Sequence, residues 1–281
     1  MSATQRINVT NESGIELLNR IENNSIDLIL TDPPYIISKK SGMDTFFKQV
    51  KKGNTKTEKD WEKYSKKLKK PDEEIKAGKG LGWSKDNYLK YGHIQGKRYC
   101  TKTDFGEWDK NFTMEELEET VKLYYKKLRR GGTVIIWFDL WKISQLKEVM
   151  EKCRFKQIRL IEWLKTNPMP INSKTNYLTN AREIALLGVK HGKPVFNSSY
   201  DNGVYRFPIA SGKYKFHPTQ KNLKLFIELI KKHSNEGDVV LDSFLGGGTT
   251  AIASKVTGRN FIGCDINTEY VTKTIQILKN F

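Results

Sequence analysis

Four consecutive residues, Asp32-Pro33-Pro34-Tyr35, bring together a carboxylate, a stiff turn and an aromatic ring. Because proline has no N–H and a fixed φ, the carbonyl groups of this turn are left to face a ligand. The Asp32 carboxylate and the Pro33 carbonyl can both accept hydrogen bonds from an amino group conjugated to an aromatic ring. Twisting that amine frees its lone pair for in-line attack on a methyl sulfonium, while Tyr35 stacks on the ring, a contact worth roughly 1–3 kcal/mol. The same four residues are also compatible with an ordinary Asp-Pro turn beside a core tyrosine.

A second segment, from Asp242 to Thr250, contains three consecutive glycines and the start of a predicted helix. Glycines let the backbone approach a ligand, and a helix N-terminus offers free N–H groups. The spacing is not G-x-G-x-x-G. About 17 residues beyond the glycines, Asp265 ends a predicted strand, where an acid can accept both ribose hydroxyls of a nucleoside. The loop and the acid together indicate a cofactor that carries a nucleoside.

Alternating strands and helices are predicted to position both segments. Continuous apolar runs such as residues 26–31 indicate strands covered on both faces, and apolar residues at helical spacing indicate the helices between them. The predicted strands cover residues 6–10, 26–31, 133–138, 157–163, 183–189, 238–242 and 260–265, and the predicted helices cover residues 14–23, 113–128, 141–152, 222–233, 249–257 and 268–278. This alternation is typical of an α/β fold with a doubly wound, mainly parallel sheet, which binds ligands at the carboxyl ends of its strands.

Residues 38–103 interrupt this pattern directly after Tyr35. The segment is rich in lysine and poor in aliphatic residues, and only residues 58–70 suggest a helix. Compact domains seldom contain loops beyond about 12–15 residues unless the loops are functional or disordered. We therefore expect one domain over residues 1–281 with a mobile basic insertion at 38–103. A solvated linker without a role is the alternative, but the position beside an active-site turn argues against it.

Composition narrows the class of protein. The chain has 281 residues and a formal net charge of +17, which favours binding to polyanions unless it only reflects a lysine-rich surface. No apolar run approaches the roughly 20 residues of a membrane span, and the start of the sequence has no signal-peptide pattern. Cys100, Cys153 and Cys264 form no metal-binding spacing, so we expect no metal site and a cytoplasmic location.

Taken together, these segments resemble the amino-group DNA methyltransferases. Residues Asp32–Tyr35 match the catalytic motif of that family, and the segment Leu241 to Thr250 matches its cofactor loop, usually D-P-F-x-G-S-G-T-T. His217-Pro-Thr-Gln-Lys221 is similar to an H-P-T-Q-K segment that contacts the methionine end of the cofactor. The catalytic motif precedes the cofactor loop, which is the circularly permuted, or beta, order of the family. Residues 104–109 and 163–170 are similar to segments of the modification methylases of type IIS restriction systems, which methylate adenine.

The resemblance implies a Rossmann-like, S-adenosylmethionine-dependent methyltransferase fold, with a seven-stranded, mainly parallel sheet that contains one antiparallel strand. The implied cofactor is S-adenosyl-L-methionine, and no metal is required. The implied catalytic residues are Asp32, Pro33, Pro34 and Tyr35. The implied cofactor-binding residues are Asp242, Phe244, Gly246, Gly248, Thr249, Thr250, Asp265, His217 and Lys221.

The implied substrate is double-stranded DNA, with single-stranded DNA as an alternative, in which an adenine is flipped out of the stack for methylation at N6. Residues 38–103 would then be a lid and DNA clamp, and residues 166–216 the target-recognition region. That region contains side chains able to read base edges: Asn167, Asn172, Lys174, Asn176, Asn180 and Arg182. A cognate restriction endonuclease and a homodimer are the partners that the resemblance implies. The aromatics Trp137, Phe138 and Trp141 are expected in the core, and His191 and His233 on the surface.

Two departures from the family pattern and three alternatives remain. Ser243 replaces the usual proline and Gly247 the usual serine of the cofactor loop, but both are small, so binding should survive. Family members commonly have an Asp after the first strand that recognises the cofactor adenine; this chain has Asn11, Glu12 and Ser13 there, so that contact stays open. Methylation of cytosine N4 uses the same geometry, although cytosine enzymes tend to have Ser where this chain has Asp32. RNA or a glutamine amide as acceptor fits the motif less well, and a catalytically inactive DNA-binding protein is the non-enzymatic alternative.

Overall fold

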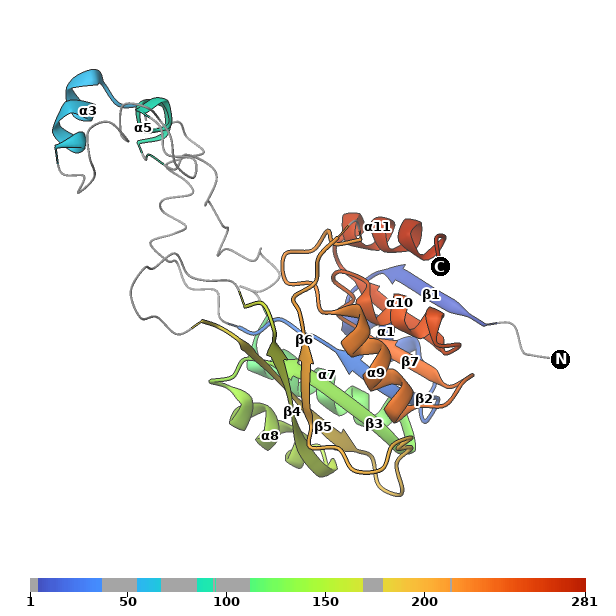
Figure 1. Ribbon diagram of the computed structural model, residues 1–281. Coiled ribbons are helices and arrows are strands. Elements are labelled where there is room, and N and C mark those ends of the chain that lie inside the picture. Colours follow the sequence, from blue (N-terminus) through green and yellow to red (C-terminus); the bar gives the residue numbers. More distant parts are fainter. Residues whose placement is uncertain are drawn as a thin grey trace. The chain divides into compact units, whose positions relative to one another are not determined.

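The computed structural model describes residues 5–36, 55–66, 85–92, 94, 112–168, 179–212 and 214–281 (Figure 1). The chain divides into two compact units. The first consists of Met1–Tyr35 and Phe112–Phe281, and it contains both sequence motifs. The second, Ile36–Asn111, contains the lysine-rich segment that the sequence predicts as an insertion.

Two helices of the second unit pack together through aromatic side chains. Helix α3 (Glu58–Ser65) begins with a capping box formed by Thr57 and Asp60, and its last helical residue comes before the predicted end at residue 70. Helix α5 (Lys85–Tyr91) was not predicted. The Tyr64 and Tyr88 rings stack at a centroid distance of 4.4 Å. This aromatic contact gives the lysine-rich segment a small apolar centre of its own.

The first unit is built on one eight-stranded sheet in the order β1-β8-β7-β2-β3-β5-β4-β6. The strands are β1 (Ile7–Asn11), β2 (Ile26–Thr31), β3 (Leu128–Phe138), β4 (Lys156–Lys165), β5 (Arg182–Val189), β6 (Val204–Phe207), β7 (Val239–Asp242) and β8 (Asn260–Asp265). Strand β5 runs antiparallel to both of its neighbours, β3 and β4, and all other pairs are parallel. The predicted parallel sheet with one antiparallel strand is therefore confirmed.

The sequence predicts seven strands, whereas the sheet in the described part of the chain has eight. The additional strand, β6, has only four residues and forms the edge of the sheet by pairing with β4. Four residues between Gly203 and Pro208 are too few to produce a readable alternation of apolar and polar side chains. Pairing with β4 forms this strand, so the sequence alone does not reveal it.

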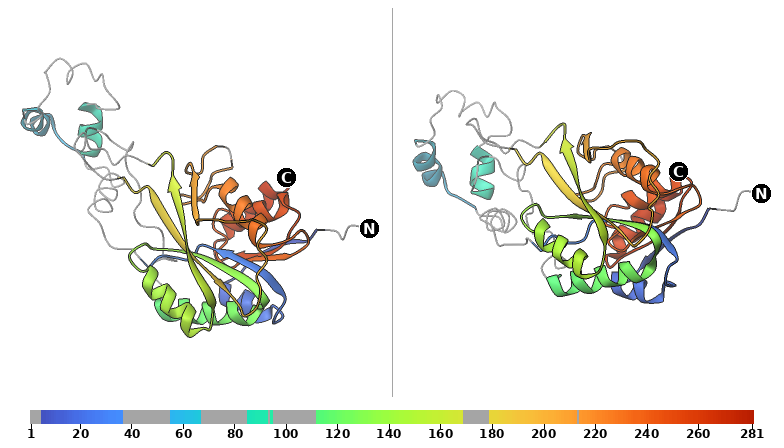
Figure 2. Two further views of the ribbon diagram at one scale, coloured as in Figure 1. Left: turned by 60° about the horizontal axis from the view of Figure 1, so that its bottom comes forward. Right: turned by 90° about the horizontal axis from the view of Figure 1, so that it is seen from below.

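Helices cover both faces of the sheet (Figure 2). On one face, α1 (Gly14–Arg20) packs against α7 (Met114–Lys127), which packs against α8 (Ile143–Lys152). On the other face, α10 (Thr249–Val256) lies between α9 (Leu223–His233) and α11 (Thr268–Leu278). Helix α7 begins with the predicted capping box of Thr113 and Glu116. The doubly wound arrangement that the sequence predicts is confirmed.

The chain reverses its winding direction between β7 and β2. From β7 it continues through α10 to β8 on one side, and from β2 it continues to β3 on the other. The two strands are paired in register, with Leu28 opposite Val240 and Ile29 opposite Leu241. Their carboxyl ends therefore lie side by side at a topological switch point, where open α/β sheets bind ligands.

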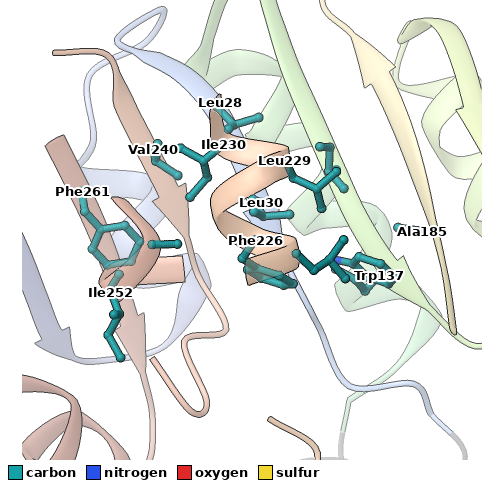
Figure 3. Packing of buried hydrophobic residues seen from close by; sticks show 14 of the residues in the cluster. Leu28, Leu30, Trp137, Ala185, Phe226, Leu229, Ile230, Val240, Ile252 and Phe261 are labelled. Atoms are coloured by element: carbon teal, nitrogen blue, oxygen red, sulfur yellow. The ribbon is translucent and has the colours of Figure 1, made fainter. Parts of the chain in front are cut away.

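The core between the sheet and α9 explains why the strands are so apolar (Figure 3). Leu28, Leu30 and Val240 are fully buried and pack in one cluster with Phe226, Leu229 and Ile230 of α9. The rings of Trp137 and Phe226 stack at 6.1 Å. Trp137 and Phe138 are 0% and 1% exposed, so their prediction as core residues is confirmed.

Two side chains do not lie where the sequence predicts. Trp141 is 86% exposed, because α8 begins at Ile143 and leaves Trp141 in the preceding turn. His233 is buried, because it lies on the inner face of α9 with its ring 5.5 Å from that of Phe196. His191 is exposed as predicted. Among the described residues, none of the helices combines the length and the apolar composition needed to cross a membrane.

Candidate active site

The Asp32 motif follows β2 directly and lies at the switch point. Pro33 and Pro34 are buried, whereas Asp32 and Tyr35 are partly exposed. The Tyr35 hydroxyl donates to Oδ1 of Asp32 over 2.8 Å. The Tyr35 ring meets the ring of Phe138 edge to face at 5.9 Å. Because Phe138 ends the neighbouring strand β3, this contact holds the motif against the sheet.

Lys221 joins the catalytic motif to the cofactor loop. Its ammonium lies 2.9 Å from Oδ2 of Asp32 and 2.9 Å from the Tyr35 hydroxyl. Its main-chain carbonyl accepts a hydrogen bond of 3.4 Å from Thr249, at the start of α10. The resemblance assigns Lys221 to the cofactor, but the structure places the end of its side chain on the Asp32 carboxylate.

Glu183 and Lys165 complete a cluster of four charges with Asp32 and Lys221. The sequence analysis missed Glu183 and Lys165. Oε2 of Glu183 lies 2.6 Å from Lys221, and Oε1 lies 2.7 Å from Lys165. Glu183 is near the beginning of β5, and because β5 is antiparallel, its beginning lies at the edge where the parallel strands end. An acidic residue at the start of a strand recognised as antiparallel is the signal that would have identified it.

Burial and pairing with opposite charges shift the pKa values of these groups in opposite directions. Burial raises the pKa of the Asp32 carboxyl above its ordinary value, although the Lys221 ammonium opposes the shift. Burial alone would lower the pKa of Lys221, but the carboxylates of Asp32 and Glu183 raise it well above its usual range. Burial alone would raise the pKa of Glu183, but Lys221 and Lys165 hold it below its ordinary value. Lys221 is therefore a cation at neutral pH.

Asp242 ties the cofactor loop to its surroundings. Its side chain is buried and accepts hydrogen bonds from Thr31 at 2.8 Å, from Thr250 at 2.6 Å and from the N–H of Phe244 at 3.0 Å. Burial raises the pKa of Asp242 to about 6, although these donors oppose the shift. Its carboxylate thus links the ends of β2 and β7 to the first turn of α10.

The glycines of the loop are required by its backbone. Gly246 and Gly248 have φ angles of 48° and 71°, in the left-handed region that favours glycine. Gly248 is the N-cap of α10 and provides no side chain to cap it. A Cβ on Gly247 would lie 2.7 Å from Cγ of Gln220, so the H-P-T-Q-K segment packs directly on the loop.

Asp265 lies beside this loop, at the end of β8. One of its oxygens accepts from the N–H of Gly246 and the other from the N–H of Asn267, both over 2.8 Å. Burial raises its pKa, and these two N–H groups oppose the shift. Each oxygen of an ionised carboxylate has a second lone pair, so Asp265 retains the capacity to accept two hydroxyl groups.

His217 and Phe244 line the same loop. His217 is 8% exposed, and its Nε2 lies 3.8 Å from the position of a Cβ on Gly246. Burial, with a smaller effect of Lys221, lowers the pKa of His217 to about 4, so the imidazole is neutral at neutral pH. The Phe244 ring is partly buried and meets Phe112 edge to face at 5.4 Å.

This arrangement fits a cofactor that carries a ribose and an amino-acid carboxylate. Asp265 offers acceptors for ribose hydroxyls, and the uncapped first turn of α10 offers N–H donors for an anion. The three residues at the position where the family has its adenine-binding Asp all interact with other groups of the protein. Glu12 pairs with Arg20 at 2.6 Å, Asn11 donates to the Asp265 carbonyl at 2.8 Å, and Ser13 caps α1.

The predicted target-recognition region is only partly described. Asn172, Lys174 and Asn176 lie outside the described residues, as does the segment 104–109. Asn167 accepts a hydrogen bond from the N–H of Ile209 over 2.8 Å, and Arg182 pairs with Glu162 at 2.7 Å. Asn180 is exposed. A role of these residues in reading DNA stays a prediction.

Solved structures with a similar fold define the class of protein. The crystal structure of an M1.HpyAVI–SAM complex matches with a TM-score of 0.60 and 24% identity, over 96% of this chain and 99% of that chain. The PvuII DNA methyltransferase, described as cytosine-N4-specific, matches with a TM-score of 0.62 and 16% identity, over 97% of this chain and 86% of that chain. The fold is that of the S-adenosylmethionine-dependent methyltransferases.

Sequence comparisons identify the family within this class. A family model described as DNA methylase matches residues 26–276, and the chain belongs to this family. Type II methyltransferase M2.DpnII of Streptococcus pneumoniae is 34% identical over 187 residues, which are 60% of this chain and 69% of the relative. Type II methyltransferase M2.MboI of Moraxella bovis is 26% identical over 96% of this chain and 86% of the relative. The chain is a DNA methyltransferase of the restriction-modification type, and S-adenosylmethionine is its cofactor.

Proposed function

We propose that the chain methylates adenine at N6 in a specific DNA site and is the modification half of a restriction-modification system. The family covers both adenine N6 and cytosine N4, so the acceptor is inferred from the site. The observation that carries the proposal is the ionisable Asp32, held at the switch point beside Pro33 and Tyr35 and paired with Lys221 at 2.9 Å. The family tends to have a serine at this position in cytosine enzymes.

The proposed reaction depends on positioning. Asp32 and the Pro33 carbonyl accept hydrogen bonds from the two N–H groups of the amine, while Tyr35 stacks on the flipped base. S-Adenosylmethionine supplies the methyl group from its sulfonium. Asp265 and the first turn of α10 hold its two ends in place. The methylated amine then loses one proton, which passes to solvent.

The proposed substrate contacts extend beyond this site. Residues 38–103 are proposed to close over the DNA and bind its phosphates, and residues 166–216 to recognise the target sequence. A restriction endonuclease that cuts the same unmethylated sequence is the proposed partner of the modification enzyme. Deleting the methyltransferase while keeping that nuclease should be lethal to the host cell.

The experiment that tests the proposal is transfer of labelled methyl from S-adenosylmethionine to unmodified duplex DNA, followed by nucleoside analysis. We expect N6-methyladenine from the wild type and a loss of at least about 100-fold in rate for Asp32→Ala. Cofactor binding by the variant, measured by calorimetry, controls for its folding. N4-methylcytosine as the product would overturn the adenine assignment, and no transfer to single- or double-stranded DNA would overturn the proposed activity.

A further inference from the structure

Both oxygens of Asp32 already have donors in the structure. The Tyr35 hydroxyl donates to Oδ1 over 2.8 Å, and the Lys221 ammonium lies 2.9 Å from Oδ2. Each oxygen has a second lone pair, so a target amino group can either share the Asp32 carboxylate with these donors or replace one of them. Of these two donors, Lys221 also lies within reach of a second anion.

That second anion is Glu183. It lies 2.6 Å from Lys221, closer than Asp32 does, and its other oxygen is held by Lys165 at 2.7 Å. Lys221 is 5% exposed, so water cannot compensate its charge if it loses both carboxylates. With Glu183 in place, Lys221 can release Asp32 and remain paired.

We propose that Lys221 is a placeholder for the target amino group and that Glu183 is the residue that retains it when the base arrives. In the free enzyme, Lys221 keeps Asp32 ionised and oriented. In the complex, the amine takes Oδ2 while Lys221 stays on Glu183. The inference rests on the proposed methyl transfer at Asp32, and Glu183 acts as a positioning residue.

The groups that set the charge of Asp32 are few. Tyr35 comes from its own turn, Lys221 from the segment before α9, and Glu183 from β5, while Asp242 at the end of β7 lies nearby. Lys221 favours the ionised form of Asp32, and Glu183 disfavours it. Removing Lys221 or Glu183 should therefore move the titration of Asp32 in opposite directions.

The test measures single-turnover methyl transfer to unmodified plasmid DNA as a function of pH. For Glu183→Gln, we expect the rate at neutral pH to fall roughly tenfold or more, because Lys221 then has no second anion to hold it when the amine displaces it from Asp32. The acidic limb of the pH profile should move to lower pH, because Glu183 no longer disfavours the ionised form of Asp32. For Lys221→Met, the acidic limb should move to higher pH. Cofactor affinity should stay within about threefold of the wild type in Glu183→Gln.

Lys232 offers a matched control. It lies between two carboxylates in the same way, 2.6 Å from Asp201 and 2.6 Å from Glu228, but belongs to α9 and contacts β6 rather than the catalytic edge. Glu228→Gln and Lys232→Met should leave the acidic limb unmoved. The placeholder role would be overturned if the acidic limbs of Glu183→Gln and Lys221→Met shifted in the same direction, or if neither shifted. The assay reads any methylated base, so a cytosine product would overturn the proposed function without affecting this test.

A second inference comes from an independent observation, the exposure of Trp141. The side chain is 86% exposed and follows Leu140, which is 45% exposed. The main-chain N–H of Trp141 donates to Oδ1 of Asp139 over 3.0 Å, and this hydrogen bond braces the turn that presents the side chain. Tryptophan is enriched at interfaces, because its large apolar ring carries a polar N–H.

The position of this turn identifies its partner as DNA. Thr31 is paired with Ile136, so β2 and β3 end at the same edge, and the turn 139–142 follows β3 where the Asp32 motif follows β2. We infer that Trp141 stacks on a base next to the target adenine and supports the distorted duplex after flipping. The inference needs only a DNA substrate at Asp32.

Duplexes with the mapped target site test this role. Trp141→Ala should lower methyl transfer roughly tenfold or more on a fully paired duplex, and Trp141→Phe should retain most of the rate. An abasic site opposite the target base makes flipping easier, so it should restore most of the rate of Trp141→Ala. Tyr200 is a matched control, because it is fully exposed but precedes β6 at the opposite edge of the sheet. Wild-type rates for Trp141→Ala, or an equal loss on the abasic duplex, would overturn the inference.

Discussion

Three aspartates end neighbouring strands at the carboxyl edge of the sheet, and each is stabilised in a different way. Asp32 after β2 is paired with a lysine, Asp242 of β7 accepts from hydroxyl groups, and Asp265 of β8 accepts from backbone N–H groups. Burial raises the pKa of all three. Of these three aspartates, Asp32 alone is paired with a cation, which suits the exchange of partners proposed for it.

Asp242 should make the stability of the fold depend on pH. Its pKa is about 6 in the folded protein, against an ordinary value of 3.8. Between these values the folded state holds a proton that the unfolded state has lost, so the free energy of unfolding falls as the pH rises from about 4 to about 6. Asp242→Asn stays neutral, so over this range it should gain stability relative to the wild type, by up to about 3 kcal/mol.

Denaturant unfolding of both proteins between pH 4 and pH 7 measures this difference. Glu269→Gln removes an exposed carboxylate and is the control for the loss of a carboxyl group outside the core. A constant difference between wild type and Asp242→Asn across the range would show that Asp242 does not titrate near pH 6.

At the scale of elements, α10 and α11 meet at a glycine. Gly248 has a φ of 71°, and a Cβ there would lie 2.5 Å from the side chain of Thr274 in α11. Gly248→Ala should therefore cost both backbone strain and a steric clash, together about 2–4 kcal/mol of unfolding free energy. Because Gly248 is the N-cap of α10, the helix proposed to bind the cofactor, the affinity for S-adenosylmethionine should fall as well.

Gly237→Ala separates the two effects. Gly237 has a φ of 84°, but a Cβ there would meet nothing within 4 Å. This variant should lose only the strain energy, about 1 kcal/mol, and keep its cofactor affinity. Thermal unfolding and calorimetric titration of both variants give the comparison, and equal losses in the two would exclude the clash with Thr274.

At the scale of the whole molecule, positive charge is concentrated in one stretch of the chain. Between residues 38 and 103 there are nineteen lysines and arginines and eight acidic residues, so this stretch carries +11 of the net charge of +17. If it binds phosphates, each contact releases counterions, and the affinity for DNA falls with salt at a slope of about −0.9 per contact.

Replacing three lysines of this stretch tests its role in DNA binding. Lys66, Lys69 and Lys70 changed together to Gln should reduce the salt slope of DNA affinity by about two to three. The control changes Lys122, Lys147 and Lys152, which are exposed on α7 and α8 and paired with acidic residues. Fluorescence anisotropy between 50 and 200 mM salt compares the two variants, and equal slopes would contradict the proposed clamp.

The sequence by itself determined most strands and helices and both motifs, because these depend on local patterns. Buried parallel strands are continuously apolar, a helix repeats its apolar residues every turn, and Asp32–Tyr35 and the glycine loop are contiguous. The strand β6 and the exposure of Trp141 depend instead on which neighbours an element meets. Pairing with β4 creates the strand, and the start of α8 at Ile143 leaves the tryptophan in a turn.

Only the tertiary structure decided which charges surround the Asp32 carboxylate. Lys221 is 189 positions and Glu183 151 positions from Asp32 in the sequence, and the direction of β5 brings Glu183 to the edge where β2 ends. A pattern of apolar residues identifies a strand but not the direction in which it joins the sheet. The ion pair of Glu183 with Lys221, and with it the charge around Asp32, follows from that direction.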